Sequence, residues 1–223
     1  MESSDRKLPD LLFRGDSDPR NERSLRRDWN SGWLQTNLGS GGRGSELFQA
    51  PLVSLIEKHV NGDWPKTHFL SFTSSRVIAE EFARGLSDKA LAPVSSSETN
   101  WTTAILTFDT QPLTIETSAT TGVFHCRYTH RAKTESSTLT EALACAHQDA
   151  PRRGKSVPMM LIDVLSALNA VGSDAREFVE ARRKATYDRE WLVLPLERVE
   201  GVVGYSNLLD TSCIVRREKF QLV

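Results

Sequence analysis

The segment 69–84 constrains the fold of this chain more than any other, because its hydrophobic pattern changes period halfway along. Phe69 and Leu70 close an extended apolar run. After a gap, apolar side chains return at the spacing of one helix face, at Val77, Ile78 and Phe82. Hydroxyl residues fill most of the gap: Ser71, Thr73, Ser74 and Ser75. The pattern predicts a strand, a turn and a helix, in which the hydroxyls either cap the helix or orient a ligand or a catalytic carboxylate.

Length, charge and cysteine content restrict the class of protein. The chain has 223 residues, 39% hydrophobic and 26% charged, which predicts one globular domain over residues 1–223. A formal net charge of -1 gives no general attraction to nucleic acid or membranes. No long apolar run follows the charged start, so we expect neither a secretion signal nor a membrane span. Three cysteines are spaced for neither a zinc site nor a disulfide framework and predict a reducing, cytoplasmic setting without a metal: Cys126, Cys145 and Cys213.

The remaining patterns predict a mixture of strands and helices, and therefore an α+β fold. Apolar and β-branched runs indicate strands near 8–13, 101–109, 113–116, 123–128, 191–195, 199–205 and 212–217. Helical spacing indicates helices near 45–62, near 139–147, and from 173 to a basic turn at 182–184. The most hydrophobic segment, 157–171, is too short to span a membrane and is expected in the core.

Two charged residues lie where predicted strands begin or end. Arg14 follows the first strand and precedes Gly15. A guanidinium there can hold a phosphate or carboxylate in a fork, and glycine lets a flat ligand approach the backbone, although a surface arginine before a turn has the same appearance. Glu190 stands where the charged segment 187–190 enters an apolar strand. Both are candidate site residues from distant parts of the chain.

Three short motifs occur in an order that resembles the Arg-Ser-Glu branch of the ADP-ribosyltransferase superfamily: Phe13-Arg14-Gly15, Ser71-Phe72-Thr73 before a helix, and Glu190 opening a late strand. That branch includes cholera-like and clostridial binary toxins and vertebrate ecto-transferases. The resemblance implies a split β-sandwich of two small antiparallel sheets with flanking helices. Ser71 and Glu190 lie further apart here than in the compact toxins, which implies an insertion near 87–155.

The resemblance also implies a role for each matching residue. Glu190 would bond the 2′-hydroxyl of the nicotinamide ribose of NAD and stabilise the positive charge that develops as the nicotinamide–ribose bond breaks. Arg14 would pair with the NAD phosphate or ribose, and Gly15 would present backbone groups to the nicotinamide amide. Ser71 would hold Glu190 by a hydrogen bond, and Thr73 would support the pocket.

Other positions are open or depart from the family pattern. Either Phe72 or Tyr187 would stack on nicotinamide. Asp188 stands where the family has a Glu or Gln that orients the acceptor. Its shorter side chain leaves the acceptor open between arginine, asparagine, a nucleotide and water. If the register is different, Glu197 or Glu200 is the alternative catalytic acid.

The resemblance thus implies an NAD-dependent mono-ADP-ribosyltransferase that modifies a macromolecule. A protein acceptor is expected, a nucleic acid acceptor is open, and no membrane partner is expected. The resemblance implies an effector or toxin role, with delivery into a host or target cell. Two alternatives remain: an NAD glycohydrolase with water as the acceptor, and a transferase-like binding module without activity.

Overall fold

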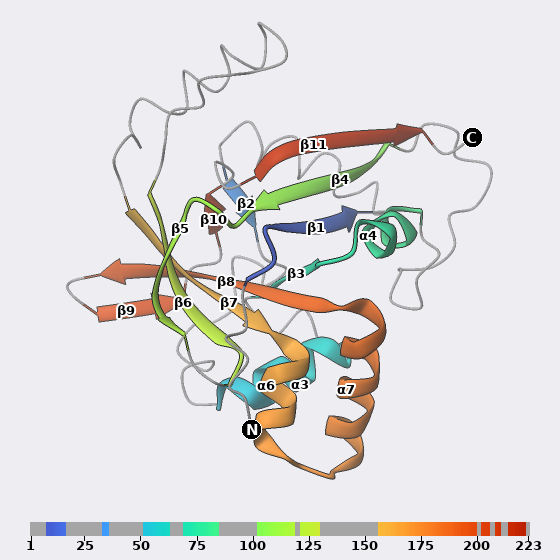
Figure 1. Cartoon of the computed structure of the whole chain (residues 1–223), viewed down its shortest axis with the longest axis vertical. Helices are drawn as coiled ribbons and strands as arrows, with labels where there is room; N and C mark the ends of the chain where they lie inside the picture. The colour runs from blue at the N-terminus through green and yellow to red at the C-terminus, as the bar shows by residue number, and fades with distance from the viewer. Residues whose placement is uncertain are drawn as a thin grey trace, which may run out of the picture.

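A curled antiparallel sheet organises the chain (Figure 1). The computed structural model describes residues 8–16, 33–35, 51–62, 69–84, 102–118, 121–129, 156–199, 202–205, 208–210 and 214–221. The strands are β1 (Leu11–Asp16), β2 (Trp33–Gln35), β3 (Leu70–Thr73), β4 (Thr102–Asp109), β5 (Leu113–Ser118), β6 (Val123–Thr129), β7 (Ser156–Asp163), β8 (Glu190–Val199), β9 (Val202–Tyr205), β10 (Leu208–Asp210) and β11 (Ile214–Gln221). The helices are α3 (Leu52–Val60), α4 (Arg76–Ala83), α6 (Val164–Val171) and α7 (Arg176–Asp188).

The main sheet has the strand order β11-β4-β1-β3-β8-β7-β6-β5, with β9 added on β8, while β2 and β10 form a separate pair. Its strands pair antiparallel throughout. Only one register pair joins β1 to β3, Phe13 with Thr73, whereas β1 pairs with β4 along its whole length. The centre of the sheet is therefore weakly connected between β1 and β3.

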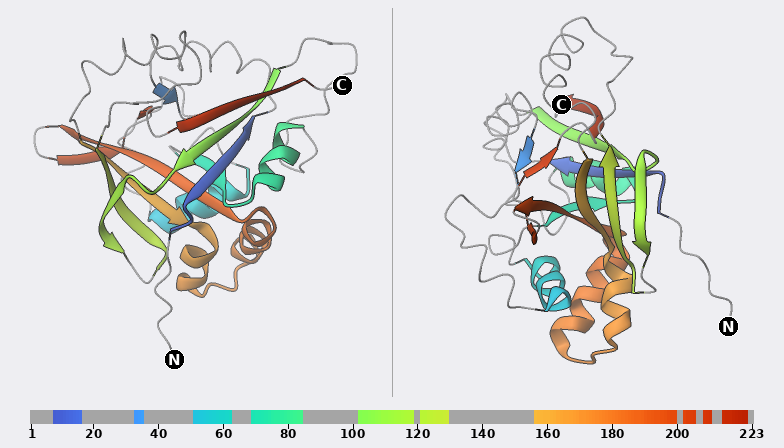
Figure 2. Two further views of the ribbon diagram at one scale, coloured as in Figure 1. Left: turned by 45° about the horizontal axis from the view of Figure 1, so that its top comes forward. Right: turned by 90° about the vertical axis from the view of Figure 1, so that its left-hand side faces the viewer.

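Two large core clusters lie on opposite faces of this sheet. Alternate residues of a strand point to opposite faces, so β8 contributes to both clusters. The strand-side cluster contains Trp191 and Val193 of β8 together with side chains of β1, β3, β4, β6 and β7. The helix-side cluster contains Leu192 and Leu194 of β8 and buries them against α3, α6 and α7. Figure 2 shows these three helices gathered on one side of the sheet.

Helix α4 covers a different part of the sheet, beside β1 (Figure 1). A small third cluster joins Ala79 and Ala83 of α4 to Ile105 of β4. Gly15 of β1 is required at this contact, because a Cβ atom there would lie 1.9 Å from the carbonyl oxygen of Ala79. The glycine after Arg14 thus has a packing reason of its own.

The α+β class is confirmed, but the prediction of two small sheets is wrong, because β1–β3 pairing joins the strands into one sheet. The range suggested as an insertion, 87–155, contributes three integral strands: β4, β5 and β6. The helix expected near 139–147 and the start of the one expected near 45–62 lie outside the described residues. No helix in the described ranges is long and apolar enough to cross a membrane.

Two element boundaries also differ from expectation. Segment 157–171 divides at Asp163, whose side chain accepts a hydrogen bond from the Ser166 backbone N–H at 3.2 Å and caps α6. Helix α7 does not stop at the basic turn 182–184 but continues to Asp188 and ends at Arg189, which has a left-handed backbone. Strand β1 extends to Asp16, so Arg14 lies inside the strand and not at its end.

Candidate active site

Strand β3 lies between β1 and β8, and this order brings three of the predicted site residues onto neighbouring strands. Arg14 is on β1, Ser71 on β3 and Glu190 on β8. Antiparallel pairing places Thr73 opposite Glu190 and Ser71 opposite Leu192. Residues from distant parts of the chain therefore lie on adjacent strands, although strand alternation puts Arg14 on the face of Leu12 and Phe72, opposite Ser71 and Glu190.

Polar side chains gather on the helix side of β3 and β8. Phe72 and Trp191 point into the strand-side cluster, so their neighbours on each strand point the other way. We call this group the polar cluster; it comprises His59, Ser71, Thr73, Asp188 and Glu190. His59, Thr73, Asp188 and Glu190 are each at most 6% exposed. Burial at this level strengthens charge interactions within the group, because water screens them little.

Thr73 links the turn before α4 to the start of β8. Its hydroxyl donates to the backbone carbonyl of Asp188 at 2.7 Å and accepts from the backbone N–H of Ser75 at 3.0 Å. The backbone N–H of Ser74 also donates to the carbonyl of Arg189 at 3.2 Å. Ser75 stands at the N-cap position, but its side chain makes no capping hydrogen bond. The expected capping of α4 by Ser75 is thus not found, whereas Thr73 holds the turn before the helix and the backbone that leads into Glu190.

Ser71 has a neighbour that the sequence analysis missed. Its hydroxyl oxygen lies 2.8 Å from Nε2 of His59 on α3. The His59 ring packs edge-to-face against Phe69, with 5.4 Å between ring centroids. A signal was available, because His59 falls on the buried stripe of its helix at helical spacing from Leu55 and Ile56. A histidine at an apolar position of a helix needs a polar partner, and here Ser71 is one.

The predicted hydrogen bond between Ser71 and Glu190 stays a prediction. The two residues are diagonal neighbours on β3 and β8, because Glu190 pairs with Thr73. Diagonal neighbours in an antiparallel pair are about 7–8 Å apart, a separation that a long side chain such as glutamate can bridge.

Arg14 crosses the weak connection between β1 and β3. Its Nη1 donates to the backbone carbonyl of Ser71 at 2.9 Å. The guanidinium therefore holds β3 through Nη1, while its Nε is enclosed without a partner among the described residues.

The two aromatic candidates differ in location. Phe72 is 3% exposed and packs edge-to-face against Phe108 in the strand-side cluster, on the face opposite Ser71. Tyr187, near the end of α7, is 67% exposed. Of the alternative acids, Glu197 pairs with Gly204 in the part of β8 that lies beyond β3, and Glu200 is outside the described residues.

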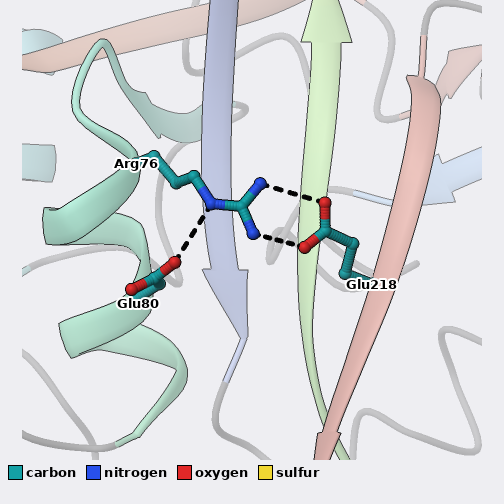
Figure 3. A network of polar contacts seen from close by, with 3 residues as sticks. All are labelled: Arg76, Glu80 and Glu218. Atoms are coloured by element: carbon teal, nitrogen blue, oxygen red, sulfur yellow. Dashed lines mark hydrogen bonds and ion pairs between the residues drawn. The ribbon is translucent and has the colours of Figure 1, made fainter.

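An ion-pair network fixes the start of α4, directly after the hydroxyl-rich turn (Figure 3). Arg76 donates from Nη1 to Glu218 Oε1 at 3.0 Å, from Nη2 to Glu218 Oε2, and from Nε to Glu80 at 3.0 Å. These hydrogen bonds, first to Glu218 and then to Glu80, raise the pKa of Arg76 further above its usual range. The network ties α4 to β11, and the sequence analysis did not identify it.

The described residues contain no group of three or more His, Cys, Asp or Glu side chains arranged to hold a metal ion. Comparison with models of known protein families and with curated proteins found no match to this chain.

Proposed function

We propose that the chain is an NAD-dependent mono-ADP-ribosyltransferase, which cleaves the nicotinamide–ribose bond of NAD and transfers ADP-ribose to a macromolecule. One observation carries the proposal: Arg14, Ser71 and Glu190, chosen from short motifs, lie on three consecutive strands of one sheet. Their order along the chain and the arrangement of β1, β3 and β8 both agree with the Arg-Ser-Glu pattern. The likeness to an ADP-ribosyltransferase fold is part of the same proposal.

Glu190 is the proposed catalytic carboxylate. Breaking the nicotinamide–ribose bond develops positive charge on the ribose, as in glycoside hydrolysis. A carboxylate that is 5% exposed acts on this charge through a poorly screened environment and is fixed before the reaction begins. Thr73 supports this arrangement, because it holds the backbone of Asp188 immediately before β8.

Arg14 and Tyr187 are the proposed binding residues. Arg14 is partly exposed, and its guanidinium suits a phosphate oxygen of NAD, with a charge-assisted hydrogen bond worth about 1.5–3 kcal/mol. Tyr187 has an exposed ring next to Asp188 and is preferred over the core residue Phe72 for stacking on nicotinamide. Gly15 contributes through the close approach of α4 and β1 that it permits.

Nicotinamide release from NAD, followed by chromatography, tests the proposal. We expect release by the wild type and a loss of at least about 100-fold in Glu190→Gln. Glu177→Gln, on the exposed surface of α7, is the matched control and should retain full activity. Arg14→Lys keeps the charge but loses the fork, so KM for NAD should rise. Absence of release by the wild type at high enzyme concentration, or full activity of Glu190→Gln, would overturn the proposal.

A second candidate, an NAD glycohydrolase, is favoured by the burial of Asp188. In the resemblance this position orients the acceptor, yet Asp188 is 6% exposed, which suits a water molecule better than the side chain of a macromolecule. Incubation of the protein with labelled NAD and a cell lysate separates the two activities. Labelled macromolecules support the transferase, whereas free ADP-ribose without labelled macromolecules supports the hydrolase.

A further inference from the structure

His59 is a buried titratable side chain that the proposed reaction leaves without a role. It is 3% exposed, and its Nε2 lies 2.8 Å from the hydroxyl of Ser71. Nothing in the Arg-Ser-Glu pattern requires a histidine at this place. The contact between His59 and Ser71 therefore has no explanation in the proposed reaction.

Counting protons shows why the direction of this hydrogen bond matters. A serine hydroxyl carries one proton and two acceptor lone pairs. If Ser71 donates to His59, its only proton is used and it cannot also donate to the carboxylate of Glu190. If Nε2 of His59 carries a proton and donates to Ser71, the serine proton is free for Glu190. The tautomer of His59 thus decides whether Ser71 can orient the carboxylate.

We propose that His59 is a positioning residue, whose Nε2–H donates to the Ser71 hydroxyl and directs the Ser71 proton toward Glu190. The inference rests on the proposed function, since it gives a role to a residue behind the proposed catalytic acid. His59 acts through Ser71 and touches no substrate. The glutamate, the serine and the histidine then form a chain of hydrogen bonds from β8 through β3 to α3.

The surroundings of His59 hold its ring in place. Phe69 packs against the ring edge-to-face. At the end of α3, Asn61 donates to Glu57 at 2.6 Å and to the backbone carbonyl of Glu177 on α7 at 3.0 Å. These contacts fix α3 against α7, so the imidazole has little freedom to turn away from Ser71.

Imidazole NMR tests the direction of the hydrogen bond without any assay of activity. In protein labelled with ¹⁵N on histidine, we expect Nε2 of His59 to carry a proton and its signal to move in Ser71→Ala. The signal is assigned by its absence from His59→Gln. An Nε2 without a proton in the folded wild type would overturn the proposal, whatever the enzyme does.

Kinetics test the consequence for the proposed site. His59→Phe should lower kcat by about 10- to 100-fold with little change in KM, as misplacement of a catalytic group does. His59→Gln, which keeps an N–H donor, should recover part of the loss. His59→Phe combined with Ser71→Ala should be no slower than Ser71→Ala alone, because both act on the same proton.

Val60→Ala, on the same buried face of α3, is the control for damage to the helix and should retain kcat. Wild-type kcat in folded His59→Phe, or additive losses in the double variant, would overturn the inference. If the wild type releases no nicotinamide, the proposed function fails, and the NMR experiment still decides whether His59 donates to Ser71.

Discussion

Thr107 of β4 carries a buried hydroxyl. It is 5% exposed, and its Oγ1 has no hydrogen-bond partner among the described residues. A buried polar group without a partner costs about 1–3 kcal/mol. We expect Thr107→Val, which keeps the shape of the side chain, to raise the free energy of unfolding by about 1 kcal/mol. Urea denaturation measures this as a higher midpoint with an unchanged slope.

Thr110 provides the matched control, because it is equally buried but well bonded. Its hydroxyl lies 3.1 Å from the carbonyl oxygen of Asp10 and also contacts that of Pro9. Thr110→Val should therefore lower stability. A loss of stability in both variants would show that Thr107 has a partner after all.

Cys126 makes stability depend on pH in the alkaline range. Burial, and secondarily the charge of Glu116, raises the pKa of its thiol from 9.0 to about 12. Between these values the unfolded chain loses the proton and the folded chain keeps it. Stability from this group is therefore complete below pH 9 and falls as the pH rises toward 12, by about 1.4 kcal/mol per pH unit.

The difference in unfolding free energy between wild type and Cys126→Ala isolates this effect from other groups that titrate in the same range. We expect the difference to be constant from pH 7 to pH 8.5 and to shrink from pH 9 upward. If the unfolding free energies of the two proteins change with pH in parallel, the buried thiol is not the source of the alkaline loss of stability.

At the scale of elements, the Arg76–Glu218 pair joins α4 to the last described strand. Exposure of the Arg76 side chain is 41%, so solvent screens the pair, while the forked geometry favours it. A double-mutant cycle with Arg76→Gln and Glu218→Gln should give a coupling of about 0.5–1 kcal/mol that declines with salt. The coupling should exceed that of Arg127 with Glu116, because Nε and Nη2 of Arg127 both contact the same oxygen, Oε1, of a carboxylate that is 40% exposed, whereas the Glu218 carboxylate is 16% exposed. A coupling between Arg76 and Glu218 equal to or smaller than that between Arg127 and Glu116 would contradict a stabilising role for this pair at the start of α4.

The elements also show what the local sequence can predict. Strand β3 and helix α4 follow from the change of period near Ser71, because neighbouring residues specify them. The end of α7 does not follow, because the basic residues 182–184 satisfy the helix-terminus rule although tertiary packing of Ala181 and Ala185 carries the helix further. Gly15 was assigned to a ligand because the approach of Ala79 is a contact between distant segments.

At the scale of the whole molecule, the sequence predicted the class but not the connections. The motifs mark Arg14, Ser71 and Glu190 as a set, and the sheet places these residues on adjacent strands, while their joint role as a site stays a prediction. The division into two sheets was wrong because a single register pair, Phe13 with Thr73, decides it. His59 was missed because its partner lies across the fold. The sequence of one segment specifies only weakly which distant segment it will pair with.

Strand β8 belongs to both large clusters, which predicts that they unfold together. Leu192 of the helix-side cluster and Leu161 of the strand-side cluster are each fully buried. In the pairing of β7 with β8, Leu161 lies opposite Val193, and the next pair along the strands, Ile162 with Leu192, belongs to the helix-side cluster. Leu192→Ala and Leu161→Ala should each lower the free energy of unfolding by about 2–5 kcal/mol. Because the backbone of β8 cannot leave one cluster and remain in the other, far-UV and near-UV circular dichroism should report one midpoint in each variant. Separate midpoints in either variant would mean that the two faces of the sheet unfold independently.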